Sequence, residues 1–434
     1  MICLLLDIVY VLLLVLLAPW ILYRMTTQKR YRVGWKERLG FVPVRFTNQP
    51  CIWVHAVSMG EINAIGTLIE KIHRVLPQFE IVISSTTDTG ISRAKKLYGS
   101  SHRVFFFPLD FSQAVKKALK RLRPQLCIMM ELEVWPNFMS ETARQGIPVM
   151  VANGRISSAK GFPRYRRIAP LVRPIFRRLS LALVQDETYA ERFRYLGVLR
   201  ERVQVAGSLK YDTAEVGDTV AGAEELAEQL GLRKDEPIWV AGSTGPGEEE
   251  IVLNSFSQLR QAKELQQIRL VIVPRKPERF DEAARLIESR GYQLIRYSRV
   301  KAGEYKVSDR DSRAVILGDT MGDLRKFYNL ASVVFVGRSL VPMGGSDMIE
   351  AAGLAKPVIV GPYTENFIDS MKKLVAADGI KVVADEIQLT EMTEKLLQDT
   401  ESARQVGRRA RQVIIENKGA TGRTVEAVAK LMTN

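Results

Sequence analysis

The chain has 434 residues and a net charge of +15, with 63 Lys and Arg against 48 Asp and Glu. This length suits about two domains, and 46% hydrophobic with 26% charged residues excludes a disordered chain. Three cysteines without a CxxC pair and three scattered histidines argue against a disulfide framework and a zinc site.

The first predicted element is an apolar N-terminal segment. Residues 2–23 are almost wholly apolar, interrupted mainly by Asp7, and about 20 such residues span a bilayer. A basic cluster follows the segment and none precedes it, which argues against a cleaved signal peptide and assigns the rest of the chain to the cytoplasm. We expect an anchor over residues 1–24 that either spans the membrane or lies in its surface, because Asp7 is costly at depth.

The positive charge has three candidate partners: nucleic acid, an anionic membrane surface and anionic small substrates. Basic residues concentrate directly after the apolar segment and again over residues 160–178. The first cluster comprises Arg24, Lys29, Arg30, Arg32, Lys36 and Arg38. Because no nucleic-acid-binding motif accompanies these clusters, we expect an anionic inner-membrane surface as a partner and no nucleic acid.

Two runs of alternating strand-like and helix-like segments follow the anchor. The strand-like segments of the first run are residues 51–57, 80–84, 103–107, 125–130 and 148–152. Those of the second run are residues 238–241, 270–273, 315–317, 333–336 and 357–360. Amphipathic segments between them predict an α/β protein, with parallel sheets covered by helices on both faces.

The domain boundaries follow from this alternation. We predict a first domain over residues 25–212, a connection rich in Ala, Gly and Glu over residues 213–236, and a second domain over residues 237–434 with C-terminal helices. In doubly wound sheets, ligands bind outside the carboxyl ends of the strands. Functional residues are therefore expected directly after each strand.

Ser58, Gly60 and Glu61 follow the first predicted strand, at the start of a helix. A glycine there permits close approach of a ligand, and a helix N-terminus favours anions. Ser58 and Glu61 also have the spacing of a capping box, which is a purely structural interpretation.

A second polar group follows the fourth predicted strand. Glu131 and Glu133 can bind sugar hydroxyls there, and Trp135 can stack on an apolar face of a sugar. The proline after Trp135 is explained by a helix start, whereas Glu131 is not. Asn153 and Arg155, after the next strand, extend the same edge.

Small and charged residues also follow the strands of the second half. Ser243 and Thr244 lie at a strand-to-helix turn, where main-chain N–H groups suit a phosphate. Arg275 follows the next strand, and a guanidinium binds phosphate well, although surface arginines are far commoner. Residues 318–323 and 337–350 complete the set, with helix capping as the structural alternative for its acidic residues. Neither a GxGxxG nor a Walker sequence is present.

Together these stretches resemble the Kdo transferases, the 3-deoxy-D-manno-octulosonic acid transferases of lipopolysaccharide assembly. The matching blocks are residues 55–61, 85–90, 131–137, 207–212, 274–280, 319–324 and 337–350. The resemblance implies the GT-B architecture, in which two Rossmann-like domains face a cleft that holds the active site.

The resemblance also implies the reaction. An inverting glycosyltransferase would move Kdo from CMP-Kdo to a lipid A precursor of the lipid IVA type, at the inner membrane and without a cofactor or a metal. Glu61 is implied as the general base, and Glu131 and Lys210 as groups that stabilise the transition state. The residues implied for the CMP moiety are Pro274, Arg275, Met321, Gly322, Asp323, Asp347, Met348, Ile349 and Glu350. Further substrate contacts are expected from Ser58, Gly60, Glu133, Asn153, Arg155, Ser243 and Thr244.

The chain departs from the family pattern in its second half. Gly245, Lys276 and Ser346 stand where the family has histidines, and Asp323 replaces a glutamate. One alternative is therefore a GT-B enzyme with a different activated sugar or acceptor, or a nucleotide-sugar epimerase, which would need no membrane anchor. Another is a catalytically degenerate membrane-attached binding protein, against which the retained Glu61 argues.

Overall fold

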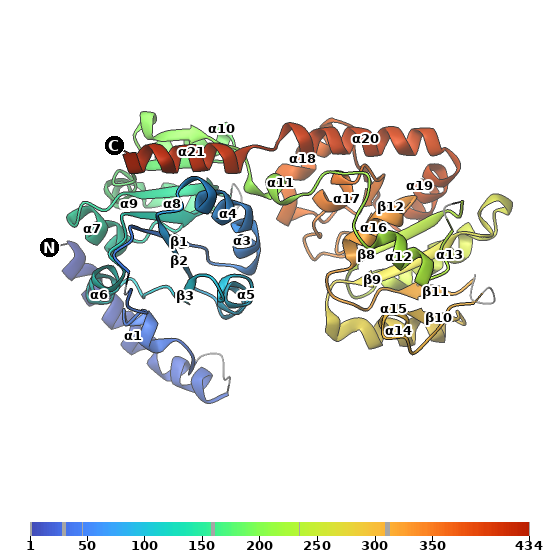
Figure 1. Cartoon of the computed structure of the whole chain (residues 1–434), viewed down its shortest axis with the longest axis horizontal. Helices are drawn as coiled ribbons and strands as arrows, with labels where there is room; N and C mark the ends of the chain where they lie inside the picture. The colour runs from blue at the N-terminus through green and yellow to red at the C-terminus, as the bar shows by residue number, and fades with distance from the viewer. Residues whose placement is uncertain are drawn as a thin grey trace. The chain divides into compact units, whose positions relative to one another are not determined.

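The computed structural model describes residues 2–27, 32–45, 47–157, 161–233, 235–308 and 313–433. Lys29, Arg30 and Lys160 of the basic clusters lie outside these residues. The chain divides into two compact units, drawn in Figure 1. The first unit comprises residues 1–213 and 418–434, and the second comprises residues 214–417.

The first unit is built on a seven-stranded parallel sheet in the order β3-β2-β1-β4-β5-β6-β7. Its strands are β1 (Cys51–His55), β2 (Glu80–Ser85), β3 (Arg103–Phe106), β4 (Leu126–Met130), β5 (Val149–Gly154), β6 (Leu181–Val184) and β7 (Val203–Val205). The sequence predicts the first five and misses β6 and β7. Helices cover both faces, so the strands are continuous apolar runs.

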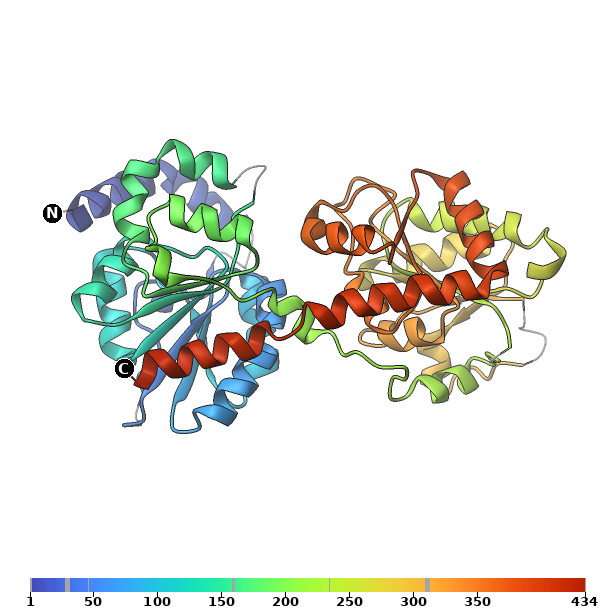
Figure 2. The same cartoon turned by 90° about the horizontal axis from the view of Figure 1, so that it is seen from above.

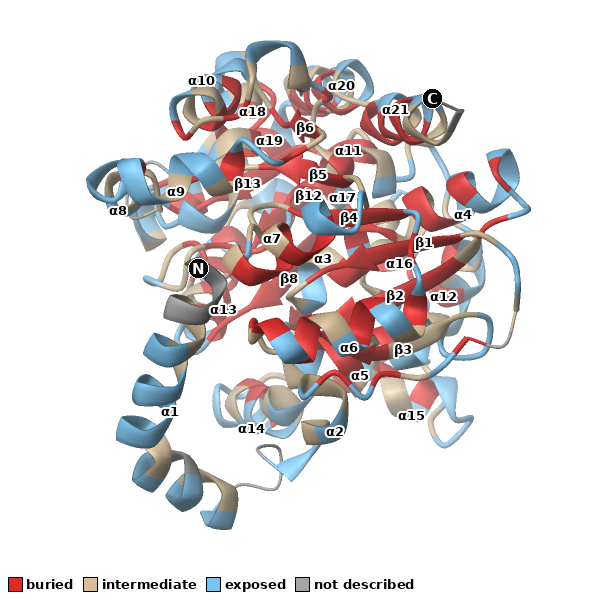
Figure 3. Ribbon diagram, turned by 90° about the vertical axis from the view of Figure 1, so that its left-hand side faces the viewer, coloured by how far each residue is buried: buried red, intermediate tan, exposed pale blue. Residues whose placement is uncertain are grey.

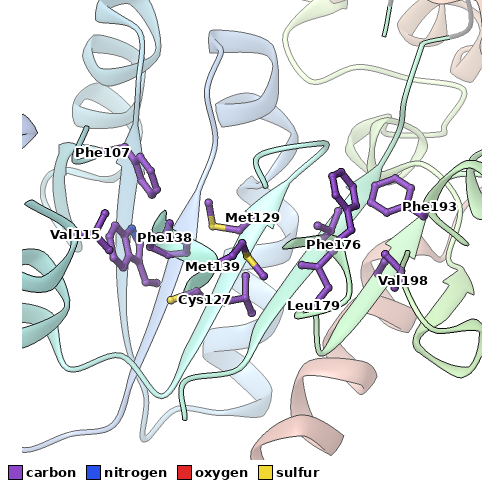
Figure 4. Close-up of a cluster of buried hydrophobic side chains, with 14 of the residues drawn as sticks. Phe107, Val115, Cys127, Met129, Phe138, Met139, Phe176, Leu179, Phe193 and Val198 are labelled. Atoms are coloured by element: carbon purple, nitrogen blue, oxygen red, sulfur yellow. The ribbon is translucent and has the colours of Figure 1, made fainter. Parts of the chain in front are cut away.

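The helices of the first unit are α1 (Ile2–Thr27), α2 (Trp35–Arg38), α3 (Met59–Ala64), α4 (Gly66–Val75), α5 (Asp88–Tyr98), α6 (Ser112–Leu122), α7 (Pro136–Arg144), α8 (Gly161–Arg167), α9 (Ala169–Phe176), α10 (Glu187–Tyr195), α11 (Leu209–Thr213) and α21 (Ala420–Thr433). Successive residues of β1 point to opposite faces of the sheet. Trp53 therefore joins one core, which contains Phe107 and Phe138 (Figure 4), while Ile52 and Val54 join the other.

The second unit has a parallel sheet of the same size, in the order β10-β11-β9-β8-β12-β13-β14. Its strands are β8 (Ile238–Thr244), β9 (Arg269–Pro274), β10 (Leu294–Arg296), β11 (Val315–Leu317), β12 (Val333–Val336), β13 (Val358–Val360) and β14 (Lys381–Val382). Its helices are α12 (Ala223–Gln229), α13 (Glu248–Leu259), α14 (Phe280–Ser289), α15 (Tyr297–Lys301), α16 (Leu324–Leu330), α17 (Ile349–Gly353), α18 (Ile368–Ala376), α19 (Glu386–Gln398) and α20 (Thr400–Glu416). Two parallel α/β sheets, as predicted, therefore organise the chain.

The C-terminal helix differs from the predicted domain organisation. We expected it in the second domain, but α21 belongs to the first unit, where it packs against α4 and α11 (Figure 2). Its apolar residues Ala420, Val425 and Val428 are buried in the core that contains Ile52. An amphipathic pattern predicts that a helix face is buried, but it does not tell which core receives that face.

Helix α1 is attached to the first unit through its N-terminal part. Asp7 Oδ1 accepts hydrogen bonds from the Ser112 N–H (3.0 Å) and from Asn137 Nδ2 (2.9 Å). The Tyr10 hydroxyl donates to Asp110 Oδ2 over 3.1 Å. The next turns of α1 are exposed, as Figure 3 shows, with Leu16 74% accessible. In the part of the chain that the structure describes, no helix is both long and apolar enough to cross a membrane, so the expected spanning anchor over residues 1–24 is not supported.

Asp110 connects α1 to the start of α7. Its carboxylate accepts hydrogen bonds from the main-chain N–H groups of Asn137 (3.0 Å) and Phe138 (2.8 Å), besides that from Tyr10. Burial raises the pKa of Asp110 to about 6, and these hydrogen bonds oppose the rise. Because buried N–H groups need acceptors, Asp110 fixes the loop that enters α7.

We expect Asp110→Ala to lower the free energy of unfolding of the first unit by about 2 kcal/mol, since two buried N–H groups lose their acceptor. Hydrogen exchange should accelerate at the amides of Asn137 and Phe138. Asp385→Ala, which removes an exposed cap of α19, is the control and should leave those two amides unchanged. Unchanged exchange in Asp110→Ala would contradict the role of the carboxylate.

Candidate active site

Neighbouring strands bring the predicted residues of the first unit to one edge. β4 lies between β1 and β5 in the sheet. Glu61 follows β1 on α3, Glu131 follows β4, and Asn153 lies near the end of β5. Because the strands are parallel, these residues share the carboxyl edge, where doubly wound folds bind ligands. The order of the strands, which the sequence does not state, is what makes them neighbours.

Glu61 takes part in the N-terminal cap of α3 and also has a raised pKa. Ser58 and Glu61 form the predicted capping box, and Glu61 also accepts the Val57 N–H over 3.0 Å and the Ser58 hydroxyl over 2.9 Å. Burial, and then the nearby Glu131 carboxylate, raise the pKa of Glu61 to about 7, although the hydrogen bonds from Val57 and Ser58 oppose this. A carboxyl that titrates near neutral pH can accept a proton from a substrate hydroxyl. Gly60 leaves open space beside it, since an added Cβ would approach only Ser58 Oγ, at 3.8 Å.

Arg155 holds the second carboxylate. Its Nε donates to Glu131 Oε2 over 2.8 Å. Burial disfavours the charge of Arg155, but Glu131 outweighs it, and a smaller contribution from Glu61 helps to raise the pKa of Arg155. Glu131 itself adopts a left-handed conformation, with φ of 56°, so the chain turns sharply where the carboxylate enters the edge. Glu61, Glu131 and Arg155 thus form one electrostatic group.

Glu133 lies in the same loop as Glu131 and accepts a hydrogen bond from the side chain of Trp135. Trp135 Nε1 donates to Glu133 Oε2 over 2.8 Å, and His55 Nε2 lies 3.8 Å from the same oxygen. His55 is fully buried, stacks on Phe107 with ring centroids 4.0 Å apart, and contacts Ser84 Oγ through Nδ1 at 2.9 Å. No separate role for His55 was predicted from the sequence. Its position as the last residue of β1, next to β4, is the feature that connects it to this edge.

Asn153 positions the helix that carries Lys210. Asn153 is buried in a left-handed conformation, with φ of 55°, and its Oδ1 accepts the Leu209 N–H over 3.1 Å. That bond holds the start of α11, which contacts α3. Lys210 is half-buried on α11, so the helix of Lys210 lies beside the helix of Glu61.

In the second unit, β8 lies between β9 and β12. Ser243 and Thr244 end β8, and the Arg275 N–H after β9 donates to the Thr244 carbonyl over 3.0 Å. Arg275 has an exposed side chain, whereas Pro274 is buried. The hydroxyl of Thr244 is fully buried and donates to Glu249 Oε1 over 2.7 Å. Arg275 is therefore open to a ligand and the Thr244 hydroxyl is not.

The turn after β8 does not offer its N–H groups to a ligand. Glu248 is fully buried, and its carboxylate accepts the N–H groups of Gly245 (2.8 Å), Ser339 (2.8 Å) and Leu340 (2.9 Å), as well as that of Arg338. The carboxylate occupies the main-chain concavity in which a phosphate was expected. Anion binding at this turn must therefore come mainly from side chains.

The remaining predicted donor residues differ in what they present. Asp323 is buried and forms ion pairs with Lys301 (2.7 Å) and Lys326 (2.9 Å). Although burial opposes it, hydrogen bonding from these lysines lowers the pKa of Asp323 to about 2. Met321 beside it is 67% exposed, and Gly322 is exposed with φ of 97°. Asp323 is thus held within the unit, while Met321 and Gly322 face outward.

The block before α17 presents two acidic side chains and some main chain. Met348 and Ile349 are buried, so they offer only backbone groups. Asp347 and Glu350 are exposed, and Asp347 Oδ1 also accepts the Ile349 N–H over 2.9 Å. Ser346 donates to the Ser243 carbonyl over 3.3 Å.

The fold is shared with nucleotide-sugar enzymes. The S. aureus MnaA–UDP co-structure is similar over 89% of this chain and 98% of its own, with 14% sequence identity and a TM-score of 0.57. Two α/β units with doubly wound parallel sheets are the architecture of the GT-B fold.

The family is defined by closer relatives. The sequence pattern of the family described as 3-Deoxy-D-manno-octulosonic-acid transferase (kdotransferase) matches residues 33–213. The 3-deoxy-D-manno-octulosonic acid transferase of Haemophilus influenzae is 33% identical over 92% of this chain and 91% of its own length. That of Bordetella pertussis is 31% identical over 97% and 98%, respectively. The chain belongs to the Kdo transferase family and is a glycosyltransferase.

The carboxyl group of Glu61 should titrate with a midpoint of about 7, followed by NMR of ¹³C-labelled glutamate and assigned with Glu61→Gln. Glu131→Gln should lower that midpoint, because it removes the like charge that disfavours ionisation. Glu191→Gln, at an exposed position of α10, should leave it unchanged. A midpoint near 4.5 in the unaltered chain would contradict the raised pKa of Glu61, and an unchanged midpoint in Glu131→Gln would contradict the coupling of the two carboxyl groups.

Proposed function

We propose that the chain transfers Kdo from CMP-Kdo to a lipid A precursor of the lipid IVA type, with Glu61 as the general base. The observation that carries this proposal is a half-buried carboxyl with a pKa of about 7 at the carboxyl edge of a parallel sheet. Membership of the Kdo transferase family supplies the transferred sugar.

The proposed reaction is an inverting displacement. The acceptor hydroxyl oxygen forms a bond to the anomeric carbon of Kdo while Glu61 takes the hydroxyl proton. The bond from that carbon to the phosphate oxygen breaks, and CMP leaves with the electron pair. Glu131 and Lys210 stabilise charge in the transition state. Ser58, Gly60 and the side chains that follow β4 and β5 hold the acceptor.

The second unit is proposed to hold CMP-Kdo. Arg275 supplies a cation for the phosphate, and Pro274, Met321, Gly322 and residues 347–350 surround the nucleotide. We expect no cofactor and no metal bound by the protein. Asp323 is proposed to orient the Met321–Gly322 turn.

The protein is proposed to work at the cytoplasmic face of the inner membrane, with α1 in the membrane surface. Leu12, Val15 and Leu16 are 64%, 65% and 74% exposed, and a helix with such residues outward binds at a bilayer interface. Asp7 has its partners within the protein, as described above, so it need not enter the hydrocarbon. Basic residues near Arg24 and over residues 160–178 favour anionic lipid.

A different activated sugar is the second candidate, because Gly245, Lys276 and Ser346 replace the histidines of the family. Product masses distinguish the two candidates. Transfer of another sugar from its own nucleotide donor, with no Kdo transfer from CMP-Kdo, would favour this alternative.

We expect the protein to add Kdo to a lipid A precursor when CMP-Kdo is generated in situ, with products read by mass. Glu61→Ala should lower kcat by about 10²–10⁴-fold, the usual contribution of a general base. In the unaltered enzyme, kcat should rise as the pH rises through about 7, because only the ionised carboxylate accepts a proton.

Glu191→Ala is the matched control and should retain full activity. Equal product from Glu61→Ala and the unaltered chain would remove Glu61 as the base while keeping the reaction. No Kdo transfer by folded protein would contradict the proposed function.

Leu16→Glu should reduce binding to vesicles that contain anionic phospholipid by on the order of tenfold or more, because a buried leucine contributes roughly 1.5–3 kcal/mol. The measurement is the sedimented fraction of protein against lipid concentration. Ile387→Glu is the control, since Ile387 is 68% exposed on α19 of the second unit. Equal binding by both variants would contradict a membrane role for α1.

A further inference from the structure

Left-handed backbone marks particular strand ends in this protein. Among the described residues, seven other than glycine have a positive φ. Three lie at or just beyond helix C-termini, where this conformation is common: Arg123, Ala355 and Asp378. The other four lie at the carboxyl ends of central strands: Glu131, Asn153, Ser243 and Arg338.

Strained backbone of this kind persists where the surroundings impose it, and it concentrates at functional sites. Glu131, Asn153 and Ser243 are already assigned to the proposed site. Arg338, after β12, has no role in the reaction described above. With φ of 59°, it adopts a conformation that glycine would adopt without strain.

We propose that Arg338 binds the anionic part of the nucleotide-sugar donor. The inference rests on the proposed function and adds a donor-binding residue to it. The anionic groups of the donor are its phosphate and the carboxylate of its sugar acid, and an arginine binds either through paired N–H groups.

The backbone of Arg338 is fixed by Glu248. That carboxylate accepts the N–H of Arg338 together with those of Gly245, Ser339 and Leu340. The hydrogen bond to the buried Glu248 carboxylate therefore holds Arg338 in the left-handed conformation. A glycine at position 338 would donate its N–H to the same carboxylate equally well. Because the same bonds occupy the main-chain donors of the turn, the anion must be bound by side chains.

The side chain of Arg338 lies over Gly245. A Cβ added to Gly245 would be 3.1 Å from Arg338 Cγ and 2.8 Å from Met343 Sδ. Arg338 therefore occupies the space directly beside Gly245. Because β8 lies between β9 and β12, Arg275 and Arg338 follow the strands on the two sides of β8. Two arginine residues thus flank the end of that strand in the sheet.

The guanidinium of Arg338 has unused hydrogen-bonding capacity. Its Nη2 donates to the Met343 carbonyl over 3.2 Å. Its Nε is buried and has no acceptor within the described residues. A buried N–H without an acceptor is costly, and an anionic group of the donor would supply the missing acceptor.

The test is Arg338→Gly, which removes the side chain, keeps the N–H that Glu248 binds and relaxes the left-handed backbone. We expect an unchanged or higher Tm together with a KM for CMP-Kdo raised on the order of tenfold or more, and an unchanged KM for the lipid acceptor. Arg338→Lys should lie between Arg338→Gly and the unaltered enzyme, because it keeps the charge without the planar fork. Arg123→Gly is the matched control: it also replaces a left-handed arginine, at the exposed end of α6 in the first unit, and should leave both KM values unchanged.

Calorimetric binding of CMP distinguishes the two anionic groups. Weaker CMP binding by Arg338→Gly would show that Arg338 binds the phosphate of the donor. Unchanged CMP binding with a raised donor KM would show that Arg338 binds the carboxylate of the sugar. If the unaltered enzyme transfers Kdo and Arg338→Gly keeps its donor KM, whatever the Tm, Arg338 does not bind the donor and the inference is overturned. If the unaltered chain neither binds CMP nor transfers Kdo, the proposed function fails first and the inference falls with it.

Discussion

The ion pair between Arg155 and Glu131 is the interaction on which the edge of the first sheet depends. Two carboxyl groups, Glu61 and Glu131, influence each other in a partly buried setting, where like charges repel strongly. Arg155 donates directly to Glu131 and compensates its charge. The hydrogen-bond donors to Glu61 are neutral, from Val57 and Ser58. The two carboxyl groups therefore have unequal partners: Glu131 is paired with a cation, whereas Glu61 has only neutral donors and a pKa of about 7.

The second sheet uses a buried carboxylate for a different purpose. Glu248 accepts several main-chain N–H groups from two loops, and Glu249 binds Thr244 and Arg279. These acids therefore connect the turn after β8 to neighbouring segments instead of facing a ligand. A turn that is closed from within in this way is rigid, but it has few free main-chain donors. An anion bound at this turn would therefore be held mainly by side chains.

The sequence predicted much of this arrangement and missed particular parts for physical reasons. The positions of Glu61, Glu131, Asn153 and Arg155 near the carboxyl ends of their strands were predicted, because doubly wound sheets bind ligands at that edge. Sequence does not state strand order, so the proximity of His55 to Glu133 was not predicted. Nor does it show which side of a helix start is buried, so the inward-facing carboxylate of Glu248 and the buried side chains of residues 348–349 were missed. The same limit explains why α21 was placed in the wrong domain: the apolar face of a helix does not indicate which hydrophobic core it packs against.

The role that we assign to Asp7 changes once its tertiary contacts are known. In the sequence, a carboxylate within an apolar segment argues only against deep insertion in a membrane. In the structure, Asp7 accepts hydrogen bonds from Ser112 and Asn137 at the starts of α6 and α7, and helix N-termini favour a negative charge. Asn137 lies on the helix that follows the Glu131–Trp135 loop. The contact that attaches the apolar helix to the first unit therefore also supports the loop that supplies Glu131, so the position of α1 and the geometry of the site are physically connected.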